Sequence, residues 1–432
     1  MWRRPTGGSS VGSIFAPRRG TGPVPPNWTR DATDRIMMSA RPLPQPSSPM
    51  PETTVVIVRA GLTLLIVWAV APGPSGADAT PLLRSSQSSS LADSARNGAE
   101  AHYNHAVELQ RKGDLSGAIV EYREAIRRKP DLVKAHYNLA LTLAAKGDLA
   151  GAVAEYRSTL ELRPDFAEAR QGLGVALQAK GDLTGAITEY QEAVRLQPTL
   201  VEARYNLGLA LAAKGDLAHA IEQYREVLKL KPDFTRAQEG LGAALHASGD
   251  LAGAADAYRS VIRLDPANAV AHYQLGLALE ARQDLEGAME AYRAAIRLRP
   301  AKAADAHVRV AGILRGRGDL SAAAAEYQAV LRLNPDDAAV HHDLGTVLQE
   351  EHRLDDAISH YHTALRLKPD FATAHYNLGV ALLARNKPAE AAHEFRAYLN
   401  LVPDSPLNRP SIERARTILH ILEQYEDHPQ DR

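Results

Sequence analysis

The sequence contains no cysteine. This absence excludes disulfides, thiolate zinc sites, iron–sulfur clusters, a cysteine nucleophile and a lipid anchor on cysteine. Aromatic residues make up only 5% of the 432 residues, which is little for the core of a large globular enzyme. A net charge of −1 leaves no overall basic surplus that would indicate a nucleic-acid partner. Ala and Leu dominate instead. Because both are strong helix formers, they predict a helical protein.

The common motifs of catalysis are also missing. There is no Gly-rich phosphate loop ending in Lys-Ser/Thr, no Gly-x-Gly-x-x-Gly after a strand pattern, no His-Glu-x-x-His and no Gly-x-Ser-x-Gly. Sixteen histidines are present, and a denser group of them includes His360 and His362, which point apart on a helix. We therefore predict that the protein is not an enzyme and has no cofactor and no metal site. Six other histidines recur about 10 Å apart, too far to share one metal ion, and we expect them to be packing residues: His102, His136, His272, His307, His341 and His375.

Charge is divided unevenly along the chain. Residues 1–98 carry ten Arg and five acidic residues, whereas residues 99–432 carry 40 basic and 46 acidic residues. Residues 1–52 are rich in Pro, Gly, Ser and Arg and show no apolar period, so we predict that they are disordered. Residues 80–98 are predicted to be a Ser-rich linker.

A hydrophobic segment lies between these two parts, within residues 53–79. Its uninterrupted part, Ala60 to Ala71, suits the apolar region of a secretory signal, and Ala77-Asp78-Ala79 offers a small-x-small cleavage site. Translation from Met50 instead of Met1 would give a signal peptide of ordinary length. The alternative is an uncleaved single-pass anchor. Both place the rest of the chain outside the cytoplasm, because the arginines lie on the N-terminal side, and both limit membrane contact to this segment.

A period of 34 residues runs through the remainder of the chain. Prolines recur at this spacing, except for one spacing of 35 that an extra residue near Ala303 explains. An Ala stands twelve residues before each Pro, and an aromatic residue stands eight before it. Nine such units in phase indicate a repeat protein. The aromatic residues are Tyr122, Tyr156, Tyr190, Tyr224, Tyr258, Tyr292, Tyr327, Tyr361 and Phe395.

This pattern closely resembles the tetratricopeptide repeat (TPR) family. Units such as His136-Tyr137-Asn138-Leu139 and Tyr205-Asn206-Leu207-Gly208 look most like the repeats that precede the catalytic domain of O-linked N-acetylglucosamine transferases. The resemblance implies an all-α fold, an α-solenoid coiled as a right-handed superhelix, made of nine helix-turn-helix units plus a C-terminal capping helix. The nine repeats cover residues 99–405, and residues 406–432 hold the capping helix and tail. The repeats are 99–132, 133–166, 167–200, 201–234, 235–268, 269–302, 304–337, 338–371 and 372–405; positions within each are numbered 1 to 34.

The residues of single repeats support the same fold. In the fourth repeat the apolar residues from Leu217 to Leu228 share one helical face, and Gly215-Asp216 can end one helix and cap the next. Residues Ser411 to Tyr425 carry a single apolar stripe that we expect to cover the last repeat. Gly stands at position 8 in six repeats, where it costs about 1 kcal/mol relative to Ala. We therefore expect close helix–helix approach at Gly174, Gly208, Gly242, Gly276, Gly345 and Gly379.

The resemblance also implies where a partner binds. In this family the first helix of each repeat lines the concave face, and positions 2, 5, 6, 9 and 12 look into the groove. In the transferase repeats an Asn ladder at position 6 holds the backbone of an extended peptide. Here the ladder is interrupted by Gly172, Gly240, Gln274, Arg309 and Asp343. The candidate groove residues at positions 5 and 6 are Tyr103, Asn104, Tyr137, Asn138, Tyr205, Asn206, Tyr273, Tyr376 and Asn377.

These observations predict a non-enzymatic, extracytoplasmic scaffold that binds extended segments of partner proteins on its concave face. The family's two-carboxylate clamp, with Lys at position 5 and Asn at position 9, is missing. Two alternatives remain open. One is a subunit that presents substrates to a separately encoded glycosyltransferase, since only 27 residues follow the last repeat. The other is a structural component of an envelope assembly.

Overall fold

The computed structural model describes residues 89–427, and within that range it contains nineteen α-helices, one 3₁₀-helix and no β-strand. The described residues fall into two compact units, 89–335 and 336–427. The first unit holds α3 (Ser89–Arg111), α4 (Leu115–Arg128), α5 (Val133–Lys146), α6 (Leu149–Leu162), α7 (Ala167–Ala179), α8 (Leu183–Leu196), α9 (Val201–Lys214), α10 (Leu217–Leu230), α11 (Thr235–Ser248), α12 (Leu251–Leu264), α13 (Ala269–Ala281), α14 (Leu285–Leu298), η1 (Pro300–Lys302), α15 (Ala304–Gly316) and α16 (Leu320–Leu333). The second holds α17 (Ala338–Glu350), α18 (Leu354–Leu367), α19 (Ala372–Ala384), α20 (Pro388–Leu401) and α21 (Arg409–Asp427).

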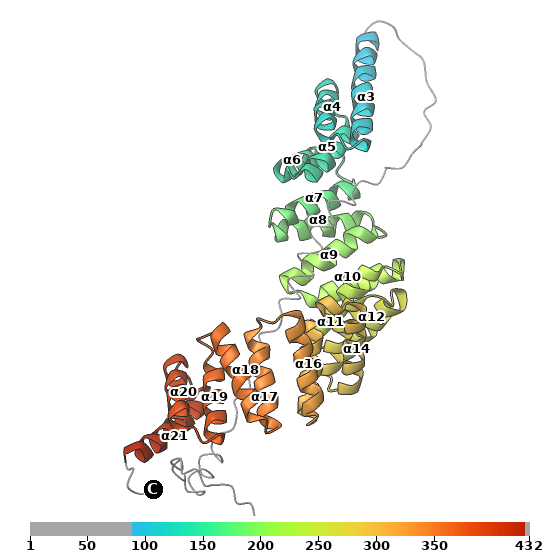
Figure 1. Cartoon of the computed structure of the whole chain (residues 1–432). Coiled ribbons are helices and arrows are strands. Elements are labelled where there is room, and N and C mark those ends of the chain that lie inside the picture. The colour runs from blue at the N-terminus through green and yellow to red at the C-terminus, as the bar shows by residue number, and fades with distance from the viewer. Residues whose placement is uncertain (1–88, 428–432) are drawn as a thin grey trace, which may run out of the picture. The chain divides into compact units, whose positions relative to one another are not determined.

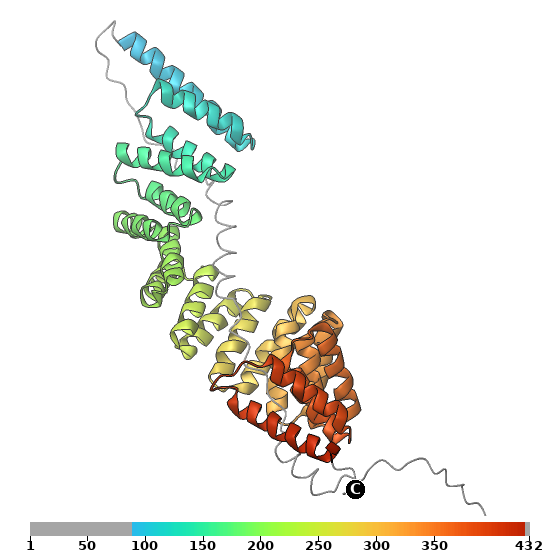
Figure 2. The ribbon, with the colours of Figure 1, turned by 90° about the vertical axis from the view of Figure 1, so that its left-hand side faces the viewer.

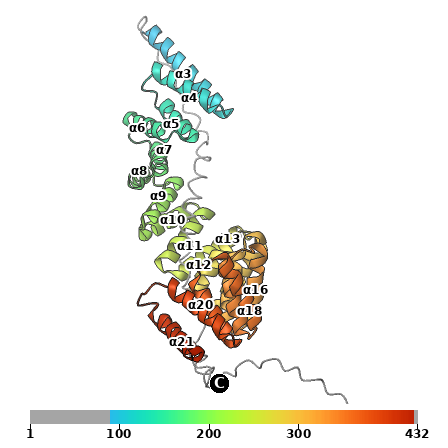
Figure 3. The same ribbon diagram turned by 60° about the vertical axis from the view of Figure 1, so that its left-hand side comes forward.

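Consecutive helices pair into antiparallel hairpins. In the first unit α3 to α16 form seven hairpins, and the second helix of each one packs on the first helix of the next (Figures 1 and 2). In the second unit α17–α18 and α19–α20 form two more hairpins, and α21 packs on α20 (Figure 3). The predicted all-α architecture of nine helical hairpins and a C-terminal helix is therefore confirmed. Of the stripe predicted for the last helix, Ile412, Ala415, Ile418 and Leu422 are buried.

The turn inside each hairpin follows the predicted cap chemistry. Gly215 ends α9 in the left-handed conformation, with φ of 88°, and the Asp216 carboxylate accepts a hydrogen bond from the backbone N–H of His219 at the start of α10. The same position 15 carries Gly with positive φ in six repeats. In the other three repeats a residue with a side chain takes this strained conformation: Gln283, His352 and Asn386.

An aromatic ring at position 24 forms the centre of every hairpin. These nine side chains are at most 4% exposed. The ring of Tyr224 lies so close to Gly208 of its own repeat that a Cβ added to that glycine would stand 2.8 Å from the ring. Four of the ring hydroxyls also donate to an acceptor at position 12, as Tyr122 does to Gln110 at 2.6 Å. Close approach therefore explains the glycines at position 8, as the sequence predicted.

One boundary differs from the sequence prediction. α3 begins at Ser89, so the second half of the predicted linker 80–98 is helical, which agrees with the Ala, Leu and Arg residues there. The extra residue near Ala303 is absorbed by the 3₁₀ turn η1, and α15 after it is a regular helix. Within residues 89–427 no helix is long and apolar enough to cross a membrane. The predicted disordered segment 1–52 and hydrophobic segment 53–79 lie outside the described residues.

We predict that Gly208→Ala destabilises the protein by about 1–3 kcal/mol, because the added methyl group overpacks the buried ring of Tyr224. The matched control is Gly312→Ala in α15, where no atom lies within 4 Å of an added Cβ. That change should stabilise by up to about 1 kcal/mol through helix propensity alone. Urea unfolding followed by circular dichroism measures both. If the two variants shift the midpoint in the same direction, the ring contact does not determine the choice of glycine.

Candidate functional site

The candidate aromatic residues at position 5 pack against other rings of their own repeat. The ring centroid of Tyr137 lies 4.8 Å from that of Phe166 and 6.1 Å from that of Tyr156. Tyr103, Tyr205, Tyr273 and Tyr376 meet the position-24 ring of their own repeat in the same way, at 5.5–6.1 Å. One side of each candidate ring is thus part of the core, and only the other side can contact a partner.

Exposure of these residues changes along the chain. Tyr103 and Tyr137 are half-buried, as is Tyr273. Tyr205 is buried, and Tyr376 is fully enclosed, because Phe395 and Tyr398 of α20 pack on its ring. The Tyr376 hydroxyl has no hydrogen-bond partner among the described residues. The structure therefore does not bring all nine candidate residues together on one accessible surface.

The amides at position 6 serve the contact between repeats. Asn138 donates from Nδ2 to the hydroxyl of Tyr103 at 2.9 Å, and the Asn377 amide is 3.0 Å from Nε2 of His342. In both cases the partner is the position-5 residue of the preceding repeat. The interruptions of the ladder have a structural reason as well. An added Cβ at Gly172 or Gly240 would collide with the position-24 ring of the preceding repeat.

Asn206 is the exception. Its side chain is 1% exposed, and neither Oδ1 nor Nδ2 has a hydrogen-bond partner among the described residues. The preceding repeat offers Gln171 at position 5 instead of an aromatic hydroxyl or a histidine. A buried amide without partners costs about 1–3 kcal/mol, so the fourth repeat gives up stability at this position. Asn104, in contrast, is exposed on α3.

The accessible part of the candidate site is a surface on α3, α5 and α7, which we call the first-helix face. Asn138 links α5 to α3, and α7 lies beside α5. The Lys134 ammonium lies 4.3 Å from the ring centroid of Tyr103 and also binds Glu100, so charge on this surface is paired. Burial raises the pKa of Tyr137 to about 12, which keeps its hydroxyl neutral. All residues of the first-helix face are half-buried or exposed: Tyr103, Asn104, Val107, Lys134, Tyr137, Asn138, Leu141, Gln171 and Val175.

The recurring histidines connect helices, as predicted for packing residues. His136 at position 4 contacts Glu155 at position 23 through Nδ1 at 2.7 Å and the carbonyl of Pro130 through Nε2 at 2.9 Å. The Glu155 contact raises the pKa of His136. Sequence reasoning missed this pairing, although the constant spacing of nineteen residues could have indicated it. Within residues 89–427 no group of three or more His, Asp or Glu side chains is arranged to hold a metal ion.

Comparison with protein families identifies the class of protein. The profile described as tetratricopeptide repeat matches residues 205–269, 257–303 and 342–406. A second profile, described as TPR repeat, matches residues 108–147, 142–181, 179–215 and 313–351. Together the matches span well over half of the chain. The protein belongs to the tetratricopeptide repeat family. A comparison with curated proteins gives no match.

Several solved structures are similar to parts of the chain. MamA is 26% identical over 40% of this chain and 93% of its own, with a TM-score of 0.38. YrrB, described as a TPR protein with an unusual peptide-binding site, is 26% identical over 41% of this chain and 92% of its own, with a TM-score of 0.39. The C-terminal part of a TPR repeat-containing protein from Cytophaga hutchinsonii is 18% identical over 55% of this chain and 97% of its own, with a TM-score of 0.51. The last of these similarities supports the fold alone.

The position-6 amides provide a matched test of the inter-repeat contact. We predict that Asn377→Ala lowers stability by about 1–3 kcal/mol, because it leaves the buried ring of His342 without this partner. Asn206→Ala should lower it less, or raise it, since the loss of packing is offset by removal of two unpaired polar atoms. Thermal unfolding of the two variants checks the difference. Equal losses would show that Asn206 has partners after all.

Proposed function

We propose that the protein is a non-enzymatic scaffold whose first-helix face binds extended segments of partner proteins. Membership of the tetratricopeptide repeat family supports a protein-interaction role. The observation that carries the site is that every residue at positions 5, 6 and 9 of α3, α5 and α7 is half-buried or exposed, whereas α9 and α19 bury all three positions. This surface joins half-buried rings to apolar side chains, with Val107 39% exposed.

The proposed surface is pre-organised for an extended segment. Phe166 and Tyr156 hold the ring of Tyr137 in place, so little side-chain entropy is lost when a partner packs on it. The exposed Asn104 amide can both donate to and accept from a peptide backbone. Asn138 already donates to Tyr103, which leaves its carbonyl oxygen available to a backbone N–H. Rigid aromatic anchors of this kind often dominate binding energy.

The charge pattern favours segments without a strong net charge. Lys134 is neutralised by Glu100, and position 2 varies in sign along the repeats. A surface that tracks phosphates needs basic side chains of one sign, so nucleic acid is not the proposed partner.

Two alternatives have less support. Presentation of substrates to a glycosyltransferase rests on the resemblance to transferase repeats, and the amide ladder of those repeats is interrupted here at Gly172, Gly240, Gln274, Arg309 and Asp343. Assembly by end-to-end stacking of solenoids needs an open last hairpin, but α21 covers it with Ile412 and Ile418. If the purified chain increased glycosyl transfer by a transferase fraction, that result would support the first alternative.

We also propose that the repeats act outside the cytoplasm. The support is the apolar stretch Ala60 to Ala71 with a small-x-small site at Ala77 to Ala79. If the segment is a cleaved signal, N-terminal sequencing of the purified protein should begin near Thr80. If it is an anchor, the intact chain should stay with membranes and its repeats should resist protease added from the cytoplasmic side. Cleavage of the repeats by such protease would contradict both versions.

Site-specific cross-linking tests the binding surface. The photo-reactive residue p-benzoylphenylalanine is introduced in place of Val107 or Leu141 in the full chain. We expect both positions to give adducts with the same partner protein, because they lie on neighbouring first helices. The control position is Glu222, which is exposed on α10 outside this surface and should give no such adduct.

A charge variant measures the contribution of the surface. Val107→Glu should weaken binding of the cross-linked partner by at least about 10-fold, since it places an unpaired charge in an apolar contact. Helix content should not change, because Val107 is 39% exposed. Glu222→Lys is the control. If partner binding responds to Glu222 and not to Val107, the first-helix face is not the binding surface.

A further inference from the structure

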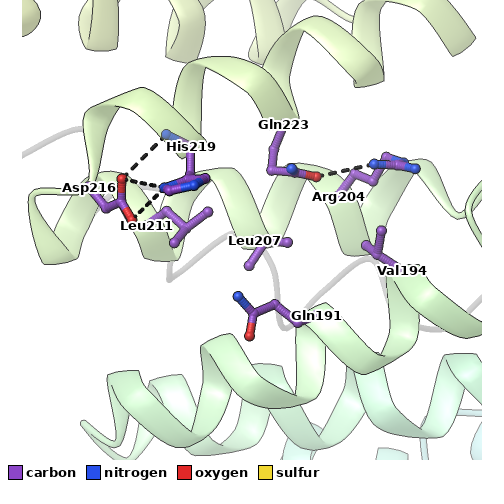
Figure 4. Close-up of a pocket in the computed structure, with 8 residues that line it drawn as sticks. All are labelled: Gln191, Val194, Arg204, Leu207, Leu211, Asp216, His219 and Gln223. Carbon is purple, nitrogen blue, oxygen red and sulfur yellow. Dashed lines mark hydrogen bonds and ion pairs between the residues drawn. The ribbon is translucent and has the colours of Figure 1, made fainter.

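A cavity of about 300 Å³ lies between α8, α9 and α10 (Figure 4). It is lined by second-helix residues and by the side of α9 that carries Leu207 and Leu211, so it is separate from the first-helix face. Figure 4 shows Leu207 near the middle of the cavity, with Gln191 of α8 opposite it. A volume of this size is at the lower limit of pockets that hold small ligands.

Two residues that line the cavity differ from the residues at the same positions of the other repeats. Val194 occupies position 28, where all eight other repeats have the larger Ile or Leu. The shorter side chain leaves space against Leu207 and Leu211. His219 occupies position 19 and is the only His there; it binds the Asp216 carboxylate at 2.8 Å at one end of the cavity.

The opposite end carries a cation that lacks its usual partner. In the third repeat Arg170 at position 4 forms an ion pair with Glu189 at position 23, at 3.0 Å. In the fourth repeat Arg204 faces the neutral amide of Gln223 at 3.2 Å and the Pro198 carbonyl at 2.7 Å (Figure 4).

Arg170 and Arg204 are the two arginines at position 4 of the nine repeats, and Arg204 is the one without a carboxylate at position 23. The fifth, sixth and eighth repeats also lack a carboxylate at position 23, but their position 4 holds Gln or His. The pKa of the Glu226 carboxylate is lowered mainly by its hydrogen bond from Lys229 and to a smaller extent by the charge of Arg204. Glu226 is thus already bound to Lys229. The remaining N–H groups of the Arg204 guanidinium can therefore bind an incoming carboxylate, in a charge-assisted hydrogen bond.

We propose that this cavity binds the C-terminal residue of a partner polypeptide whose last side chain is aliphatic. The side chain would lie against Val194, Leu207 and Leu211, and the α-carboxylate would bind Arg204. The direction is fixed by charge, because Asp216 at the other end repels a carboxylate. A cavity of this volume accommodates about one residue, and within a polypeptide only the C-terminal residue carries an aliphatic side chain together with an α-carboxylate.

Fluorescence anisotropy with two labelled probes tests the proposal on the full chain. The first probe is a fluorescein-labelled hexapeptide, Gly-Ser-Gly-Ser-Gly-Leu, with a free C-terminal carboxylate; the second is the same peptide with an amidated C-terminus. We expect the free acid to bind at least about 5-fold more tightly than the amide. Competition by unlabelled 4-methylpentanoate tests whether the rest of the polypeptide contributes, because this free acid offers the same aliphatic chain and carboxylate without a peptide group.

Three variants distinguish the contribution of the cavity's size from that of the Arg204 charge. Val194→Leu restores the side-chain size of the other repeats and should weaken binding of the free acid by at least about 10-fold. Gln223→Glu supplies Arg204 with the carboxylate that Arg170 has, and should abolish the preference for acid over amide. Glu189→Gln makes the reverse change in the third repeat and should have no effect. Circular dichroism checks that all three variants are folded.

Equal binding of acid and amide, or no binding of either, would overturn the proposal. So would unchanged binding in the folded Val194→Leu variant, and so would competition by 4-methylpentanoate as strong as by the unlabelled peptide acid, since a free acid would then be the ligand. None of these outcomes affects the first-helix face, which is tested at Val107.

Discussion

The fold depends on the contact between a buried ring at position 24 and the backbone of two first helices. Tyr224 shows its geometry. The ring lies against Gly208 in its own repeat and against Gly240 in the next one. One side chain therefore sets both the distance within a hairpin and the distance between hairpins. A side chain at either glycine would force this ring to shift, so the ring of Tyr224 and the two glycines are fitted to one another.

Sequence was sufficient for those features that a single repeat determines by itself. The turn at Gly215-Asp216, the ring at Tyr224 and the apolar stripe of α21 each follow from local spacing, and the structure confirms all three. Such features depend on residues within about one helical hairpin. Repetition then makes the prediction secure, because nine copies of one pattern leave no alternative period.

The candidate site was harder to predict, because the exposure of a side chain depends on the residues that pack against it from adjacent repeats. Asn138 is tied to Tyr103, which stands 35 residues earlier in the preceding repeat. Nothing within the second repeat indicates this contact. Tyr376 differs, because Tyr398 of its own repeat packs on it and is the only aromatic residue at position 27 of the nine repeats. The pairing of positions 5 and 6 across repeats becomes visible only when the hairpins are stacked. The same holds for the unpaired amide of Asn206, whose expected partner position holds a glutamine.

A residue that differs from those at the same position of the other repeats is informative, because the other repeats show which contact that position normally makes. Each hairpin is held by its own ring and by its neighbours, so a repeat can lose a favourable pair without unfolding the others. The fourth repeat has lost two: Asn206 lacks a partner, and Arg204 lacks a carboxylate. Asn206 has no compensating contact among the described residues, whereas Arg204 donates to neutral acceptors instead, and the cavity lies beside Arg204. An arginine left with neutral partners beside a cavity, in a repeat that keeps its ring and its helix caps, is the pattern expected where a surface has been adapted for binding.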